Sequence, residues 1–438
     1  MFRKHNVHIQ ELLSGALVAF IMKVVAAGAV FGLNVMLARM LGADGSGIFF
    51  LAYTILLIVA TIGRFGMDNA LIRFIATSHS LGSIGQVLGV YQIAMVCSFV
   101  FAGCLSLTLY FLSPWISVVV FSKVELQYPL SVMALAVVPM ALGLLHAFAL
   151  QGLKKISEAV FILSVSIPIL TCLLSFFLIP KYGINGAAWG CFAATIITLV
   201  LGKFFWHRQT SILSGKNYTP KFERAELFKS SFPLFGAAMM NLVILWSPML
   251  FLGAWETEEN LGVYSAANRT AMLTSFVLVA VNSIAAPKFA ALYKQGEFEA
   301  LQDVVFNSSK IMILFASPIL LVFIFFPELI LSVFGAEFEQ GATVLVILAV
   351  GQFINVSTGL VGCLLMMSGH EALMRNNFVF CAIFGVILNM LLIPKYGILG
   401  AAVSGAFVLA MQNTIDMVLV WKKLRIAMIP LPAFLGIK

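Results

Sequence analysis

Charged residues are scarce in this chain of 438 residues. Asp, Glu, Lys and Arg together make up 10% of it, whereas about a quarter is usual for soluble proteins. The apolar set AVILMFWYC supplies 61%, and the mean hydropathy is +1.05. Because so little charge cannot cover a soluble surface of this size, the composition excludes a soluble protein of two or three domains. It predicts a polytopic membrane protein.

The sequence also lacks the residue clusters that bind metals, form disulfides or bind nucleotides. The six cysteines lie singly in apolar runs, with no Cys-x-x-Cys pair and no Cys/His cluster, which predicts free thiols and no metal site. No glycine-rich phosphate loop with a lysine is present, which excludes ATP hydrolysis, and the intramembrane His146 stands alone. We therefore predict no enzymatic activity and no cofactor, and we expect no cleaved signal peptide at the short basic N-terminus.

What the chain does have is long, continuous apolar runs. A membrane-spanning helix needs about 20 apolar residues, and runs without alternation favour helices over a closed barrel. We expect twelve transmembrane helices, at residues 14–40, 47–74, 84–112, 128–151, 156–180, 184–206, 231–253, 260–287, 304–326, 341–367, 372–394 and 397–421.

Lys and Arg are distributed unequally between the two faces of this array. One face carries most of the 26 basic residues, and the opposite face carries only Arg39, Lys123, Lys181 and Lys395. Because basic loops stay in the cytoplasm, both termini are expected there. The net charge of +8 then reflects cytoplasmic loops and implies no nucleic-acid partner.

The chain repeats itself. IPKYGINGAA (179–188) recurs as IPKYGILGAA (393–402), identical at nine of ten positions and 214 residues apart. Six spans in each half give both halves the same orientation, so we predict two six-helix bundles related by a two-fold axis along the membrane normal. The expected domains are a first bundle at 1–208, a basic cytoplasmic linker at 209–230 and a second bundle at 231–438.

The IPKYG motif has a structural interpretation. In each copy the proline is expected to end one span, while Lys and Tyr lie at the membrane interface. Gly183 and Gly397 then allow a tight turn into the next span. A role of the motif in transport is the alternative.

Ionisable residues inside spans are functional candidates, because each costs about 2.5–3.5 kcal/mol to insert. Lys23 and Arg269 each lie about ten residues into a span with no acidic residue close in sequence. We interpret both as cations that face an aqueous cavity at the interface between the repeats; interhelical pairing is the alternative. Asn34 falls on the same helical face as Lys23.

Arg64 and Asp68 are four residues apart, a spacing that favours an ion pair within one helix. A hydrated pair that faces the cavity is the alternative, and Arg64 is then a third cavity cation. Further polar candidates inside the spans are Asn241, Asn282 and Asn355. Near the cytoplasmic boundary, Arg73, Lys288 and Lys310 either snorkel to lipid phosphates or capture an anionic substrate at the inner mouth.

Several segments resemble one known family. NVMLARMLGADGSGIFFLAYTI (34–55) and GMDNALIRFIA (66–76) resemble the start of bacterial polysaccharide-unit flippases, the O-antigen translocases of the multidrug/oligosaccharidyl-lipid/polysaccharide exporter (MOP) superfamily. The stretch at 262–302, GVYSAANRTAMLTSFVLVAVNSIAAPKFAALYKQGEFEALQ, resembles the matching part of their second half. The order and spacing of these segments cover nearly the whole chain.

The resemblance implies a MATE-like fold with alternating access and a function as a flippase in O-antigen, capsule or exopolysaccharide synthesis. Its implied substrate is an oligosaccharide on polyprenyl (undecaprenyl) diphosphate, moved to the outer leaflet of the bacterial inner membrane. Implied partners are membrane lipids, and a glycan polymerase and glycosyltransferases. The related lipid II flippases use basic residues in the first and eighth helices, which Lys23 and Arg269 match. Coupling to a proton gradient, a sodium gradient or the membrane potential stays open.

Two other readings stay open. A cation-coupled multidrug exporter of the same superfamily is the first. It is expected to carry a carboxylate in the spans of the first bundle, where only Asp68 lies. A scaffold of a glycan-synthesis complex that transports nothing is the second, and it is expected to tolerate the loss of its cavity cations.

Overall fold

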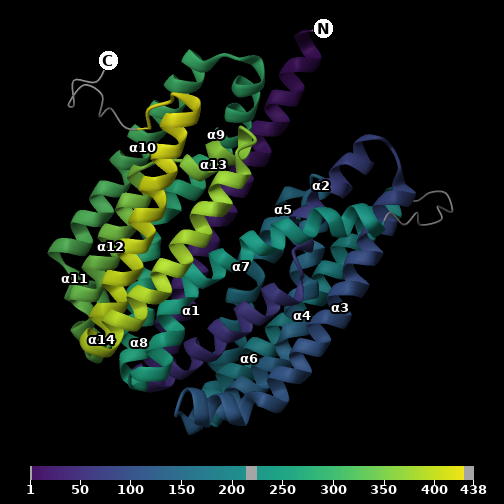
Figure 1. Ribbon diagram of the computed structural model, residues 1–438. Helices are drawn as coiled ribbons and strands as arrows, with labels where there is room; N and C mark the ends of the chain where they lie inside the picture. Colours follow the sequence, from purple (N-terminus) through teal and green to yellow (C-terminus); the bar gives the residue numbers. More distant parts are fainter. Residues whose placement is uncertain (1, 214–223, 429–438) are drawn as a thin grey trace, which may run out of the picture. The chain divides into compact units, whose positions relative to one another are not determined.

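A computed structural model describes residues 2–213 and 224–428, and it contains helices and turns but no strand in those residues (Figure 1). The backbone divides into two compact units, Met1–Met239 and Met240–Lys438. This division falls inside the helix α7, and part of the expected linker, residues 214–223, lies outside the described residues. The domain boundaries at 208 and 231 therefore stay predictions.

Unit 1 begins with α1 (Phe2–Gly63) and α2 (Met67–Ser80), followed by α3 (Ile84–Trp115). A π-helical turn, η1 (Ile116–Val120), and a 3₁₀ turn, η2 (Val124–Leu126), lead into α4 (Gln127–Gly152). The unit continues with α5 (Ile156–Val160), the π-helical segment η3 (Phe161–Ser166), α6 (Ile167–Leu213) and the start of α7 (Arg224–Trp255).

Unit 2 contains α8 (Glu258–Ala271), the 3₁₀ segment η4 (Met272–Ser275), α9 (Phe276–Gln295) and α10 (Phe298–Phe325). The short helix α11 (Pro327–Leu331) and the 3₁₀ segment η5 (Ala336–Gly341) precede α12 (Ala342–Ser357). The unit ends with α13 (Val361–Met367) and α14 (Glu371–Leu424).

Eight helical segments in the described residues are long and apolar enough to cross a membrane. Large apolar side chains on these segments are exposed. Phe111 is 75% exposed, and Phe177 and Phe325 are each 70% exposed. A water-soluble surface rarely leaves apolar patches of this extent uncovered. The chain is therefore an all-helical, multi-pass membrane protein whose outer apolar side chains face lipid.

Four of the expected spans are interrupted rather than continuous. The span expected at 47–74 breaks between α1 and α2, where Phe65 and Gly66 take positive φ angles. The span expected at 260–287 is interrupted by the 3₁₀ segment η4. The span expected at 341–367 breaks at Gly359, which has a φ angle of 80°. The span expected at 156–180 contains η3. The length of the apolar runs alone does not reveal these breaks.

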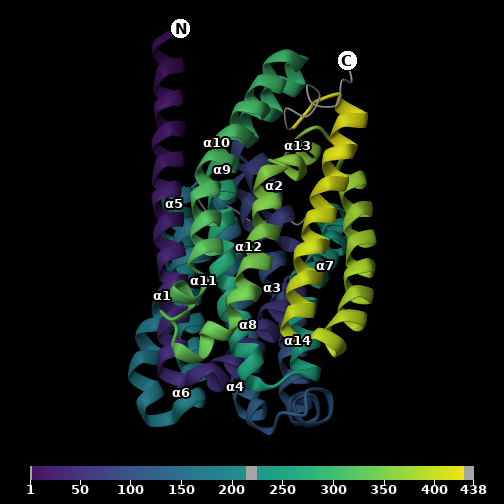
Figure 2. The ribbon, with the colours of Figure 1, turned by 90° about the vertical axis from the view of Figure 1, so that its left-hand side faces the viewer.

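The two copies of the IPKYG motif are the tips of helical hairpins. Helical hydrogen bonding runs through Pro180 and Pro394, and the direction changes three residues later, at Gly183 (φ 55°, ψ −134°) and Gly397 (φ 55°, ψ −133°). The expectation that proline ends the span is thus wrong, and glycine makes the turn because an L-residue is strained at this φ angle. In Figure 2 the two arms of α14 stand side by side.

Side-chain hydrogen bonds confirm that the hairpin arms are antiparallel. In α14, Ser404 Oγ donates to Asn389 Oδ1 at 2.6 Å, and Asn377 Nδ2 donates to Asp416 Oδ1 at 2.8 Å. In the first half, Thr198 Oγ1 of α6 donates at 3.1 Å to Ser166 Oγ, at the end of η3 directly before α6. The sequence repeat is therefore also a structural repeat.

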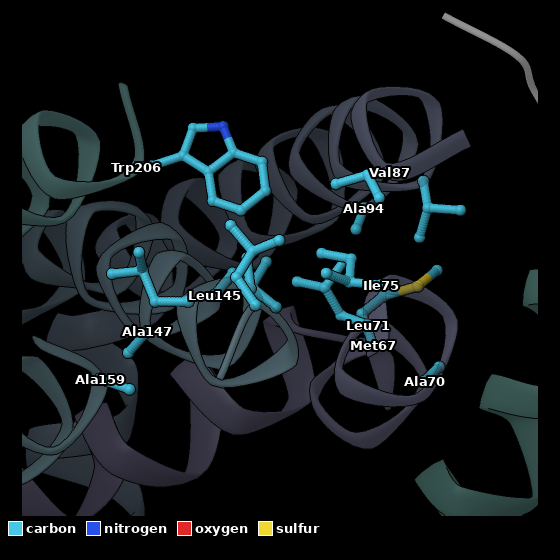
Figure 3. Close-up of a cluster of buried hydrophobic side chains, with 14 of the residues drawn as sticks. Met67, Ala70, Leu71, Ile75, Val87, Ala94, Leu145, Ala147, Ala159 and Trp206 are labelled. Carbon is cyan, nitrogen blue, oxygen red and sulfur yellow. The ribbon is translucent and has the colours of Figure 1, made fainter. Parts of the chain in front are cut away.

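The core of unit 1 lies where α2, α3, α4 and α6 meet. Figure 3 shows Met67, Leu71 and Ile75 of α2 facing Leu145 of α4, with Trp206 of α6 at the edge of the cluster. Within this core Tyr91 stacks on Trp206, with ring centroids 4.2 Å apart. The packing fixes α2 beside α4 immediately after the break at residues 64–66.

The close packing of the hairpin arms predicts that two equivalent glycines cannot be replaced by larger residues without destabilising the fold. A Cβ atom on Gly186 would lie 2.4 Å from the Leu178 carbonyl oxygen, and one on Gly400 would lie 2.4 Å from the Leu392 carbonyl oxygen. We expect Gly186→Val to lower the free energy of unfolding by about 1–3 kcal/mol or more, because the arms must separate. Thermal unfolding of the purified protein in detergent measures this.

Gly103→Val is the matched control, because Gly103 has no heavy atom within 4 Å of the added Cβ. Equal melting temperatures for Gly186→Val and Gly103→Val would contradict the hairpin geometry.

Candidate functional site

Arg64 and Asp68 form an ion pair, but not inside one helix as the spacing predicted. The Arg64 Nε donates to both Asp68 carboxylate oxygens, at 2.8 and 3.0 Å. Arg64 follows the last residue of α1, and Asp68 lies in the first turn of α2. The pair therefore bridges a helix break, and this arrangement corrects the prediction of an intrahelical pair.

The rest of the Arg64 guanidinium closes the end of α1. Nη1 donates to the Ala60 carbonyl oxygen at 3.3 Å, and Nη2 donates to Thr61 Oγ1 at 3.2 Å. A cation at a helix C-terminus and a carboxylate at the next N-terminus both match the helix dipoles. Arg64 is 7% exposed, and all three of its guanidinium nitrogens have partners. These contacts favour a structural role over the cavity role predicted for Arg64.

Lys23 and Asn34 both lie on α1, the first half-buried and the second 2% exposed. Lys23 makes no ion pair with any side chain that the structure describes. The Asn34 Oδ1 atom is buried and accepts no hydrogen bond from the described residues. Because buried polar atoms in native proteins usually have partners, Asn34 is a candidate contact for a group that the protein alone does not supply.

Unit 2 contains a cavity of about 410 Å³ with several polar groups in its wall. Asn268 and Tyr264 reach it from α8, Ser275 from η4, and Gln352 and Asn355 from α12. The Asn355 Nδ2 atom lies 3.4 Å from Gln352 Oε1, which holds the two amides together. The remaining lining is apolar and comes mainly from α7, α9 and α14. This volume and this mixture of surfaces are typical of small-molecule sites.

Arg269 is next to Asn268 and lies half-buried in the last turn of α8, directly before the 3₁₀ segment η4. A cation there is favourable for the helix dipole. Arg64 and Arg269 thus share one feature: each lies at the C-terminal end of a helix that breaks within an apolar run. Lys23 belongs to unit 1 and Arg269 to unit 2, and their convergence stays a prediction.

The other predicted site residues lie apart from the cavity. Arg73, Asn282, Lys288 and Lys310 are exposed, and Asn241 is half-buried. Lys310 Nζ lies 4.1 Å from the centre of the Phe306 ring, a cation–π contact that leaves the ammonium accessible. The exposure of Arg73, Lys288 and Lys310 does not distinguish lipid phosphates from a substrate, so their position and role stay predictions.

Sequence reasoning missed the polar cavity lining at Asn268 and Tyr264 and the hydrogen-bond partners of His146, whereas Asn389 is one of the mid-span amides expected to bridge helices. Asn268 and Tyr264 line the cavity, although only their neighbour Arg269 stood out by charge. Asn389 links both arms of α14 to α7, since its Nδ2 also donates to Ser247 Oγ at 2.9 Å. His146 was wrongly expected to stand alone: its Nδ1–H donates to the Leu142 carbonyl at 2.7 Å, and its Nε2 accepts from Tyr91 Oη at 3.0 Å.

The family of polysaccharide biosynthesis proteins matches residues 12–293, which is more than half of the chain. The protein therefore belongs to this family, which confirms the resemblance found in the sequence. The MatE family matches residues 233–391, so both halves of the chain show relationship to the MOP superfamily.

Named relatives and a solved structure agree with this assignment. The chain is 26% identical to the probable low-salt glycan biosynthesis flippase Agl15 of Haloferax volcanii, over 92% of this chain and 82% of the relative. It is 22% identical to the putative O-antigen transporter of Shigella flexneri, over 84% and 88%. The structure of the lipid II flippase MurJ in its inward closed conformation matches this chain with a TM-score of 0.75 and 14% identity, over 97% of this chain and 89% of that one. This likeness shows the fold.

Variants of Arg64 and Asp68 distinguish a role of the ion pair in stability from a role in transport. If the pair only joins α1 to α2, Arg64→Ala should lose more stability than Asp68→Ala, because Arg64 also donates to Ala60 and Thr61. The double variant should lose no more than Arg64→Ala. The coupling energy should be about 1–3 kcal/mol, because one interaction is lost in all three. Thermal unfolding of the four proteins completes the cycle.

Substrate translocation by the same four proteins provides the second readout. An Asp68→Ala variant that still translocates beside an inactive, equally stable Arg64→Ala variant would contradict the purely structural role and restore Arg64 as a cavity cation.

Proposed function

We propose that this protein is a flippase that moves a polyprenyl (undecaprenyl) diphosphate-linked oligosaccharide from the cytoplasmic to the outer leaflet of the bacterial inner membrane. The observation that carries the proposal is the family match over residues 12–293, together with relatives named as a glycan flippase and an O-antigen transporter. The product then enters O-antigen, capsule or exopolysaccharide synthesis. A glycan polymerase and glycosyltransferases are the partners that such a product requires.

Twelve membrane spans in two six-helix bundles fit the described helices. Three of the eight long segments contain 43, 56 and 53 residues, about twice the length of a single span. Each of the three turns at a glycine with a positive φ angle, at Gly42, Gly183 or Gly397. Counting each as two spans and adding the α8–η4–α9 segment gives twelve. With the asymmetry of Lys and Arg, both termini then lie in the cytoplasm.

The substrate's two chemical parts match two kinds of residue. The diphosphate is an anion, and Lys23 and Arg269 are the cations that the sequence places within the spans, one in each half. The saccharide is a neutral array of hydroxyl groups, for which the amides of Asn268, Gln352 and Asn355 in the unit 2 cavity supply donors and acceptors. The polyprenyl chain stays in lipid.

The membrane potential has the right sign to drive the outward movement of this substrate. Moving one charge through the full field is worth about 2.3 kcal/mol per 100 mV, and an inside-negative potential drives an anion outward. A diphosphate with two net charges gains roughly twice that amount if the protein's cations do not move with it. A proton or sodium gradient is the alternative source of energy.

A second candidate function is a cation-coupled multidrug exporter, favoured by the MatE match at residues 233–391. The carboxylate expected for an exporter in the first bundle, Asp68, is paired with Arg64. Unit 2 holds a buried carboxylate instead, Asp416, which is 2% exposed and accepts a hydrogen bond from Asn377. If export is the function, Asp416→Asn should make cells sensitive to cationic drugs. Unchanged drug sensitivity in both the deletion strain and Asp416→Asn cells would eliminate the exporter.

The cavity cations give the sharpest test of the flippase. In cells that lack the chromosomal copy, we expect Lys23→Ala and Arg269→Ala to leave the lipid-linked oligosaccharide in the inner leaflet, so that it accumulates at least about tenfold. The reason is the loss of charge neutralisation for the diphosphate, worth at least about 1.4 kcal/mol. Mass spectrometry of extracted polyprenyl-linked saccharides measures the accumulation.

Lys23→Arg keeps the charge and should restore function, and Lys181→Ala, at an exposed hairpin tip, is the control for mere loss of a cation. Normal lipid-linked saccharide levels in both alanine variants would refute the assignment of Lys23 and Arg269.

A further inference from the structure

A second cavity lies at the hairpin end of unit 1, outside the site described above. Its volume is about 380 Å³, and its lining is Val124, Glu125, Gln127, Tyr128, Ser131, Ile184 and Asn185. The wall is built by η2, the first turns of α4 and the residues that follow the Gly183 turn in α6. The tight turn thus fixes Ile184 and Asn185 against the start of α4.

The polar groups of this cavity are available to a ligand. The side chains of Glu125, Gln127 and Asn185 make no hydrogen bond with any other described residue. Trp189 Nε1–H donates to Tyr128 Oη at 3.2 Å, which leaves the phenolic proton of Tyr128 free to donate outward. The lining therefore offers one carboxylate, two amides, the ring and hydroxyl of Tyr128 and the Ser131 hydroxyl. Trp189 adjoins the cavity through its hydrogen bond to Tyr128.

The internal repeat shows that the hairpin itself does not require these residues. Asn185 is the one difference between the two ten-residue copies, and position 399 of the second copy is Leu. Trp189 corresponds to Val403 at the same spacing of 214 residues. Both hairpins nevertheless turn with the same φ and ψ angles to within one degree. The turn itself therefore requires neither Asn185 nor Trp189.

An aromatic belt at the membrane interface explains only part of this pattern. Tyr182 and Tyr396 occupy equivalent positions next to the two turns and are 61% and 62% exposed, as interfacial anchors in both units. Tyr128 and Trp189 are joined by a hydrogen bond and lie beside unpartnered amides and a carboxylate. An anchor in the lipid interface needs no such polar neighbours.

We propose that this cavity binds a saccharide and serves as a docking site for the glycan at the hairpin end of unit 1. The lining contains a carboxylate and no cationic side chain, which disfavours the diphosphate and suits neutral hydroxyl groups. Aromatic rings pack against the apolar faces of sugar rings, and amides satisfy hydroxyl groups in pairs. A volume near the lower end of the range for small-molecule sites favours one or two sugar units. The assignment rests on the proposed function.

Saturation-transfer NMR on the purified full-length protein tests the site directly. The probes are glucose, galactose, N-acetylglucosamine and rhamnose, each added separately. We expect at least one sugar to receive saturation, and Asn185→Leu and Trp189→Val, which introduce the residues of the second half, to weaken its binding about fivefold or more, as one lost hydrogen bond predicts. Leu399→Asn, the reverse change in unit 2, should leave the signal unchanged.

No saturation of any of the four sugars, or equal binding by the wild type and Asn185→Leu, would overturn the proposal. Translocation of the lipid-linked saccharide by the same variants separates the two claims. A protein that translocates its cargo but shows no sugar binding in this cavity refutes the docking site alone. A protein that translocates nothing refutes the flippase, while sugar binding that is lost in Asn185→Leu still supports the cavity as a saccharide site.

Discussion

Every backbone polar group inside a lipid bilayer must be satisfied by the protein, and this constraint governs the structure at each place where a helix stops. An open loop within the hydrocarbon would leave carbonyl and amide groups without partners, at several kcal/mol each. The structure satisfies this constraint in two ways. At Gly183 and Gly397 it turns within a single residue, so that few groups are released. At residues 64–66 it breaks the helix and closes the end with the Arg64 guanidinium, which donates to the Ala60 carbonyl.

The same constraint explains why charged and polar residues lie where the helices are interrupted. Arg64 and Asp68 join two helix ends whose dipoles favour their charges, and Arg269 ends α8 before the turn η4. The cavity of unit 2 adjoins that turn, with Ser275 in its wall. Discontinuous helices in transporters expose backbone and place charge at substrate sites. An interruption near Arg269 and Asn268 is therefore the structural reason for proposing that the cavity of unit 2 binds substrate.

Much of the architecture could be predicted from the sequence, because long apolar runs indicate membrane-spanning helices and the repeated motif indicates two equivalent halves. The long apolar runs and the ten-residue repeat predicted helices and equivalent hairpins, and the hairpins at Gly183 and Gly397 confirm the repeat. The break at η4 was not predictable, since Met272–Ser275 contains no Gly or Pro. The partners of Arg64 depend on a different break, the one at residues 64–66, and those of His146 come from two helices. The difference between Asn185 and Leu399 is visible in the sequence, but its position in a cavity is not.

The central claim is that this protein carries a glycan-linked lipid across the membrane, and reconstitution tests it most directly. The purified protein is placed in vesicles with extracted polyprenyl diphosphate-linked oligosaccharide, and an added glycosidase that cannot enter the vesicles cleaves only glycans on the outside. We expect vesicles with the protein to lose nearly all of the glycan to the enzyme, whereas protein-free vesicles keep about half of it protected. Equal protection in the two preparations, with the protein folded, would show that the protein is not a flippase for this lipid.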